Sequence, residues 1–233
     1  MFIGHYALGL GSKRLAPGVS LGALFLACQW ADLLWPTLVM AGVESFEIRP
    51  GNTAVTPLDF EYYPYSHSLL ALVVWGAVLA LIYRAVSGST RRGALVLGAL
   101  VVSHWVLDVV VHRPDLPLAP GTGLRLGLGL WNSIPATLAV EFGLFAAGVW
   151  LYSKATVARD RIGSLGFWAL VIFLALVEIA NIFGPPPPSI GAVTVSAQAL
   201  WLLVAWGYWV DRHREPAARD VRDGNRGVSA AGP

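Results

Sequence analysis

The chain has 233 residues, of which 56% are hydrophobic and only 13% are charged, and its formal net charge is +2. Soluble domains carry about 25% charged residues and about 45–50% apolar ones, so a soluble globular domain and a disordered chain are both poor fits. A net charge this small does not favour a polyanionic partner such as nucleic acid. The single cysteine, Cys28, excludes a disulfide framework and a thiolate metal site. The composition indicates an integral membrane protein.

Six apolar stretches approach or exceed the ~20 residues that a helix needs to cross the hydrocarbon core. They cover residues 18–43, 65–83, 93–112, 132–152, 165–184 and 189–210. Because none alternates with period two over many short segments, a β-barrel is not expected. We predict an all-α membrane protein with about six transmembrane helices and a short N-terminal re-entrant helix. Residues 1–211 would form one membrane domain and residues 212–233 a mobile polar tail.

The basic residues predict the orientation of these spans. Only Arg49, Arg113 and Arg125 of the 16 lysines and arginines fall in the loops on one side. The others lie before the first span, between spans two and three, between spans four and five, and after span six. Because cytoplasmic loops are enriched in Lys and Arg, the basic side should face the cytoplasm. We therefore expect both termini to be cytoplasmic.

Ionisable side chains are concentrated in the apolar segments, where placing them in the membrane costs free energy. Four of the five histidines and four carboxylates fall in or beside apolar segments: His5, His67, His104, His112, Asp32, Asp108, Glu141 and Glu178. An aspartate at a helix centre costs about 2.5–3.5 kcal/mol on the insertion scale. Protonation, pairing or metal binding must offset that cost. A protonated glutamate bonded to a neighbouring helix can account for one or two of these groups, but not easily for all of them.

The third span contains the most informative pattern. His104, Asp108 and His112 are spaced i, i+4 and i+8, which places them on one helix face. Pro114 ends the helix, so Asp115 lies just beyond it. Imidazole and carboxylate groups at this spacing can share a divalent cation. The alternative is a hydrogen-bonded polar stripe between helices.

The depths of these groups favour convergence. At ~1.5 Å per residue, Asp32, His104 and Asp108 lie roughly 21, 16 and 22 Å above the cytoplasmic ends of their spans. His67 enters from the outer end of the second span, and a re-entrant N-terminal helix would lift His5 to a similar depth. Histidine and carboxylate ligands without sulfur suit zinc, manganese or iron. We expect a metal site in the outer half of the bilayer.

The motifs resemble a known family. Gly4-His5-Tyr6-Ala7, Asp32, Ser66-His67-Ser68-Leu69 and His104-x3-Asp108 occur in the order seen in the bacterial membrane-bound metal-dependent hydrolase family, which includes a LexA-regulated inner-membrane hydrolase. The resemblance spans roughly residues 1–115. It implies a multi-pass enzyme of the bacterial cytoplasmic membrane whose His and Asp residues bind metal, with a suggested kinship to zinc-dependent phospholipase C.

The chain departs from this family at two motifs. Where the family has D-x-D-H, this chain has Asp32-Leu33-Leu34-Trp35, so two potential ligands are missing. Where it has H-R-G-x-T-H-S, this chain reads Tyr63-Pro64-Tyr65-Ser66-His67-Ser68, without the first histidine and the glycine. His112 and Asp115 are candidate replacements.

These patterns lead to a hypothesis about activity. His5, Asp32, His67, His104 and Asp108 would bind a divalent metal, most simply zinc, with His112 as a further ligand. The metal would acidify a water molecule, and Asp115 or Glu141 would act as general base. Arg113 and Arg125 would hold the phosphate of a lipid or lipid-linked phosphoester at the outer face.

Two other functions stay open. Intramembrane His, Asp and Glu also mark ion pathways, so a proton- or metal-conducting transporter is the main alternative. Glu141 and Glu178 suit that alternative, because no family motif explains them. A non-catalytic membrane scaffold is the third possibility.

Overall fold

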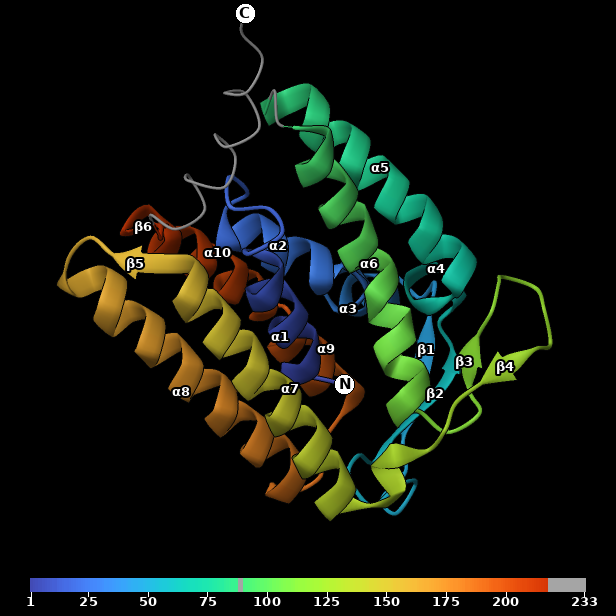
Figure 1. Cartoon of the computed structure of the whole chain (residues 1–233). Helices are drawn as coiled ribbons and strands as arrows, with labels where there is room; N and C mark the ends of the chain where they lie inside the picture. Colours follow the sequence, from blue (N-terminus) through green and yellow to red (C-terminus); the bar gives the residue numbers. More distant parts are fainter. Residues whose placement is uncertain (88–89, 218–233) are drawn as a thin grey trace, which may run out of the picture.

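The computed structural model describes residues 1–87 and 90–217 (Figure 1). These residues form mostly helices, with three short two-stranded sheets. The helices are α1 (Ile3–Ser12), α2 (Leu21–Cys28), α3 (Trp30–Met40), α4 (Pro64–His67), α5 (Leu69–Ser87), α6 (Arg91–Val111), α7 (Ile134–Ala155), α8 (Arg161–Phe183), α9 (Ile190–Ala197) and α10 (Leu200–Arg212).

Five helical segments in the described residues are long and apolar enough to cross a membrane. They are α5, α6, α7, α8 and the continuous stretch Ile190–Arg212, which joins α9 and α10. The pair α2 and α3 makes a sixth if it is one broken span, because its two halves meet at a 56° bend. The predicted all-α membrane architecture is therefore confirmed, and the predicted first span, residues 18–43, is not one straight helix.

Helix α1 lies inside the bundle rather than at its edge (Figure 1). It packs against α7, α2 and α6, and its residues are buried around most of its circumference. Its 10 residues extend about 15 Å, too short to cross a membrane. The close approach of α1 to α7 requires a glycine, since a Cβ on Gly148 would lie 2.4 Å from the carbonyl oxygen of Ala7.

The bend between α2 and α3 occurs at Gln29. This residue leaves the helical region, with φ −105° and ψ 8°, while its N–H still bonds to the carbonyl of Phe25 and its carbonyl still receives the N–H of Leu33. The last carbonyl groups of a helix have no partner within it. The break therefore leaves the carbonyl of Cys28 available to a side chain from another helix.

Each short sheet is an antiparallel pair of strands that the sequence analysis did not predict. The pairs are β1 (Ser45–Ile48) with β2 (Leu58–Tyr62), β3 (Leu116–Pro117) with β4 (Arg125–Leu126), and β5 (Thr156–Ala158) with β6 (Arg214–Pro216). In the first pair Phe46 lies opposite Phe60, and both rings contact Trp35 of α3. This hairpin is thereby attached to α3, the second half of the broken span.

The predicted tail begins later than residue 212. Residues Arg214–Pro216 form β6, which pairs with β5 at the end of α7. The Arg214 guanidinium lies over the rings of Tyr152 and Phe167 and donates to the carbonyl of Gly163. These contacts hold the segment against the bundle. Residues 218–233 of the predicted tail lie outside the described residues.

We expect Gly148→Ala to destabilise the protein, because the added methyl group would meet the Ala7 backbone and push α1 away from α7. Overpacking of this kind costs about 1–3 kcal/mol. Thermal unfolding of the detergent-solubilised protein measures the loss. Gly143→Ala is the matched control on the same helix, because nothing lies within 4 Å of a Cβ at that position. Equal stability of the two variants would contradict the proposed packing role of Gly148.

Candidate metal centre

The first cluster of possible ligands joins α1 to α6. His5, His104 and Asp108 each offer one ligand atom, and these atoms lie within 4.8 Å of one another. His5 Nε2 is 3.1 Å from Asp108 Oδ1, and His104 Nε2 is 3.2 Å from Asp108 Oδ2. The two imidazole rings stack with their centroids 3.7 Å apart. The amino group of Met1 also lies 2.8 Å from Asp108 Oδ1.

The second cluster shares His104 with the first. Asp32, His67 and His104 again bring one ligand atom each within 4.8 Å of the others. His67 Nε2 is 3.3 Å from Asp32 Oδ1, and His104 Nε2 is 3.7 Å from the same oxygen. The Asp32 side chain is 26% exposed, whereas the His67 and His104 side chains are at most 5% exposed. The combined cluster is therefore most accessible at Asp32.

Local structure explains how the five side chains meet. His104 and Asp108 occupy successive turns of α6, as their spacing predicts. Asp32 lies in the first turn of α3, directly after the bend at Gln29. His67 ends the single turn of α4, and Ser68 is extended before α5 begins. His5 is presented by the central helix α1, so four separate elements contribute.

The hydrogen bond of His104 determines which of its nitrogens is available. His104 Nδ1 lies 2.8 Å from the carbonyl oxygen of Cys28. Because a carbonyl only accepts, Nδ1 must carry the proton, and neutral His104 then presents the Nε2 lone pair. That atom is buried and has no hydrogen-bond partner of acceptable geometry among the described residues. A lone pair facing two carboxylates requires a proton or a cation between them.

This donor set fits a metal ion. Imidazole nitrogens and carboxylate oxygens are ordinary ligands of zinc, and also suit manganese and iron. The orphaned Nε2 of His104 and Nδ1 of His5 are buried polar atoms, which are costly when unpaired. The buried His and Asp groups of these two clusters can therefore hold a metal ion.

His67 has a polar chain behind it. Its Nδ1 lies 2.7 Å from the hydroxyl of Ser66, and that hydroxyl lies 2.6 Å from Oε2 of Glu44. Glu44 follows α3, and its side chain is buried. Glu44 is not predicted from the sequence, because an acidic residue in a connecting segment carries no sequence signal for burial when the hairpin after it is not predicted.

His112 belongs to a different group. Its Nδ1 is 2.9 Å from Asp115 Oδ1, and the Tyr63 hydroxyl donates to the same oxygen at 3.1 Å. The His112 ring also packs on Trp131, with centroids 4.4 Å apart. Among the described residues, neither His112 nor Asp115 belongs to the two possible metal-binding groups. The structure thus brings together five of the six predicted ligands.

Asp115 is held in its ionised form by its neighbours. Burial favours the neutral acid, but hydrogen bonds from His112, Arg113 and Tyr63 outweigh burial and keep the pKa of Asp115 below its ordinary value. Burial and the Asp115 carboxylate raise the pKa of the Tyr63 phenol well above its usual range. The phenol therefore remains a donor to Asp115.

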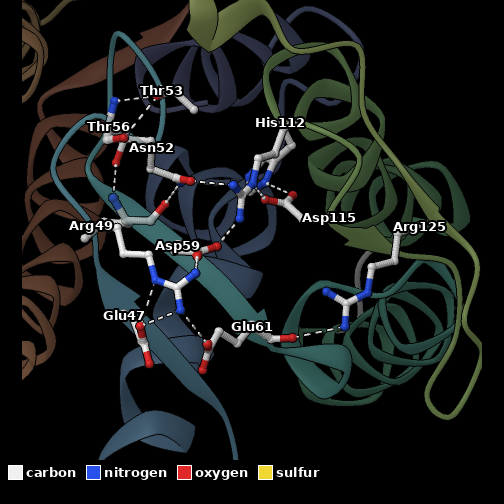
Figure 2. A network of polar contacts seen from close by, with 12 residues as sticks. Glu47, Arg49, Asn52, Thr53, Thr56, Asp59, Glu61, His112, Asp115 and Arg125 are labelled. Carbon is white, nitrogen blue, oxygen red and sulfur yellow. Dashed lines mark hydrogen bonds and ion pairs between the residues drawn. The ribbon is translucent and has the colours of Figure 1, made fainter.

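The two arginines predicted to bind substrate have different surroundings (Figure 2). Arg113 pairs with Asp59 of β2 and, at 3.1 Å, with Asp115, and it also donates to Asn52. Its guanidinium is therefore engaged within the protein. Arg125 donates to the carbonyl of Glu61 at 3.1 Å and borders a cavity of about 280 Å³.

The cavity beside Arg125 lies close to the candidate metal centre. Its lining includes Tyr63, Pro64 and the glycine-containing loop before β4. The Tyr63 ring lies 5.3 Å from the ring of His67. Tyr63 thus both lines the cavity and packs beside a possible metal ligand.

Glu141, the second predicted general base, interacts with the start of α1. Its Oε2 accepts from the backbone N–H groups of Phe2 and Gly4, at 2.9 and 3.2 Å. The first N–H groups of a helix lack partners within it, so Glu141 anchors α1 to α7. Glu178 of α8 is buried as well, and no hydrogen bond to its side chain is found within the described part of the chain.

Comparisons with known proteins identify no relative of this chain. No protein-family profile, no curated protein and no solved structure matches this chain.

We predict that Asp115→Asn lowers the free energy of unfolding at pH 7 by about 1–3 kcal/mol, because it disturbs a buried hydrogen-bond network. A carboxyl group with a lowered folded-state pKa stabilises the protein above its unfolded pKa of about 3.9, and that contribution is lost as pH falls through the folded-state pKa. The difference between wild type and variant should therefore shrink below about pH 4.

Unfolding measured between pH 7 and pH 3 in detergent checks this dependence. Glu215→Gln is the control, because the Glu215 side chain is 54% exposed, and this change should leave the pH profile of wild type intact. A difference between wild type and Asp115→Asn that stays constant over the whole pH range would contradict the assignment.

Proposed function

We propose that this protein is a membrane-embedded, metal-dependent hydrolase. The observation that carries the proposal is the convergence of three histidines and two aspartates from four elements around His104, whose bond to Cys28 leaves its Nε2 lone pair facing both carboxylates. The residues that would hold the ion are His5, Asp32, His67, His104 and Asp108. A divalent ion such as zinc supplies Lewis-acid chemistry for hydrolysis when bound.

The resemblance in the first half of the chain supports the same proposal. The residues that resemble the membrane-bound metal-dependent hydrolase family include these five. We therefore propose that this protein belongs to that family and acts in the bacterial cytoplasmic membrane. The distribution of Lys and Arg would place the basic helix ends and both termini in the cytoplasm.

The proposed substrate is a lipid or lipid-linked phosphoester that enters from the outer face. A hydrolytic site among membrane helices is reached most directly by a molecule that is itself in the membrane. Arg125 is a better candidate than Arg113 for binding the phosphate. Arg125 borders the cavity that Tyr63 also lines, whereas Arg113 is paired with two aspartates. Asp115 and Glu141 remain candidate bases, and Asp115 bonds to Tyr63, a residue of this cavity's lining.

Metal content tests the proposal. Protein purified in mild detergent without chelators should contain about one equivalent of a transition metal, and His104→Ala and Asp108→Ala should each lose most of it. His112→Ala is the matched control on the C-terminal end of the same helix, and it should retain the metal because His112 bonds to Asp115 instead. Less than about half an equivalent of transition metal in wild type would overturn the proposal that the protein is a metal-dependent hydrolase.

Activity is tested separately. Release of water-soluble phosphorus from a bacterial lipid extract, as inorganic phosphate from a monoester or as a phosphorylated headgroup from a diester, should occur with wild type, stop after chelation and return with added Zn²⁺. Arg125→Gln should raise KM more than it lowers kcat, since it would remove a binding contact. Metal-loaded protein that releases neither phosphate nor a phosphorylated headgroup from any lipid fraction would contradict the proposed hydrolase activity, and the protein would then be a metal-binding membrane protein.

The alternative function is transport of protons or metal ions. The observation that favours it is the presence of buried Glu141 and Glu178 on α7 and α8, outside both ligand groups. Proton or metal flux into liposomes that is abolished by Glu141→Gln would favour transport over hydrolysis. Absence of flux in reconstituted wild type would exclude it.

A further inference from the structure

Glu44 is a buried carboxylate that no step of the proposed hydrolysis uses. It is 3% exposed and lies between α3 and β1. Its Oε1 accepts from the backbone N–H groups of Tyr65 and Ser66, at 2.8 and 2.9 Å. Its Oε2 lies 2.6 Å from the Ser66 hydroxyl. These three contacts attach the segment after α3 to the turn that carries His67.

The directions of these hydrogen bonds follow from what each group can do. An ionised carboxylate has only acceptors, so the Ser66 hydroxyl donates its one hydrogen to Glu44. The carbonyl of Tyr63, at 3.5 Å from the hydroxyl, is a much more distant acceptor. Ser66 Oγ can then only accept from His67 Nδ1, 2.7 Å away. His67 Nδ1 therefore carries the proton.

This direction determines what His67 presents to Asp32. With the proton on Nδ1, the neutral ring has its lone pair on Nε2, which lies 3.3 Å from Asp32 Oδ1. Two acceptors at that distance are favourable only with a proton or a metal cation between them. We propose that Glu44 is a positioning residue, which acts through Ser66 to hold His67 in the tautomer that binds a metal ion through Nε2. This inference rests on the proposed metal centre.

His104 and His67 are oriented by different kinds of group. A backbone carbonyl, that of Cys28, orients His104 and cannot be changed by substitution. The partner of His67 is a side-chain hydroxyl whose direction depends on a carboxylate. A change of one atom at residue 44 should therefore reverse the whole chain of hydrogen bonds.

Glu44→Gln is that change. The glutamine carbonyl oxygen should stay at the Oε1 position, because two backbone N–H groups need an acceptor there. The amide nitrogen then replaces Oε2 and donates to Ser66. His67 Nδ1, at 2.7 Å, is a much nearer acceptor for the hydroxyl than the Tyr63 carbonyl at 3.5 Å. The hydroxyl should therefore turn and donate to Nδ1, which moves the ring proton to Nε2. His67 in that tautomer cannot bind a metal through Nε2.

Affinity for Co²⁺ and Zn²⁺, measured by chelator competition on the full-length protein in detergent, tests the proposal. Glu44→Gln should weaken binding by about 10–100-fold, the usual effect of changing an outer partner of a ligand. Ser66→Ala should weaken binding less, because it removes the chain without reversing it. The double variant should bind like Ser66→Ala and more tightly than Glu44→Gln.

That recovery is the result a purely structural role would not produce. If Glu44 only fastens the loop, the two losses should add and the double variant should bind most weakly. Additive losses, or wild-type affinity in Glu44→Gln, would overturn the proposal. Thermal unfolding of each variant shows whether a loss of binding comes from loss of fold.

The tautomer is also readable without metal, from the ¹⁵N chemical shifts of the labelled imidazole of His67 in metal-free protein. Wild type should show a protonated Nδ1, whereas in Glu44→Gln Nδ1 should have lost its proton and Nε2 alone should carry one. An unchanged tautomer in Glu44→Gln would overturn the role of Glu44. If Glu44→Gln shows the expected tautomer change but wild type binds neither Co²⁺ nor Zn²⁺, the metal centre would be overturned and the hydrogen-bond chain supported.

Discussion

The carboxylate of Asp108 lies in the interior of the helix bundle, at 2% exposure, with an imidazole against each of its oxygens. Asp108 lies in the last turn of α6, and burying a carboxylate is costly unless it is paired and hydrogen-bonded, so this group constrains what surrounds it. Its partners must come from inside the bundle. One, His104, lies on the same helix, and the other two, the His5 ring and the Met1 amino group, require an entire short helix to be enclosed beside α6.

The position of α1 and the break between α2 and α3 follow from that requirement. Helix α1 is held by Glu141 of α7 at its first N–H groups and approaches α7 where Gly148 leaves room. The break at Gln29 leaves the Cys28 carbonyl free to orient His104. It also begins α3, whose first turn carries Asp32. The segment after α3 then supplies Glu44, which reaches the turn carrying His67. Each of these elements serves the same polar cluster.

Much of the cluster could be predicted from the sequence because local periodicity governs it. The spacing of His104 and Asp108 on a helix, and the depth of Asp32 along its span, depend only on the rise and repeat of an α-helix. Other contacts join residues far apart in the chain. Arg113 pairs with Asp59 across 54 residues, and His112 is drawn to Asp115 and Tyr63 rather than to Asp108. The sequence spacing does not distinguish His112 from His104. They differ because α6 ends at Val111, so His112 lies beyond the helix and off the face that carries His104 and Asp108.

The most direct measurement is X-ray absorption at the zinc edge on the purified, zinc-loaded protein. The proposed centre predicts nitrogen and oxygen ligands at about 2.0–2.2 Å, with the outer-shell scattering of imidazole rings, and loss of part of that scattering in His104→Ala. A sulfur shell at about 2.3 Å would place the ion at Cys28. Such a shell, or a spectrum without imidazole scattering, would contradict a centre built on His104 and Asp108.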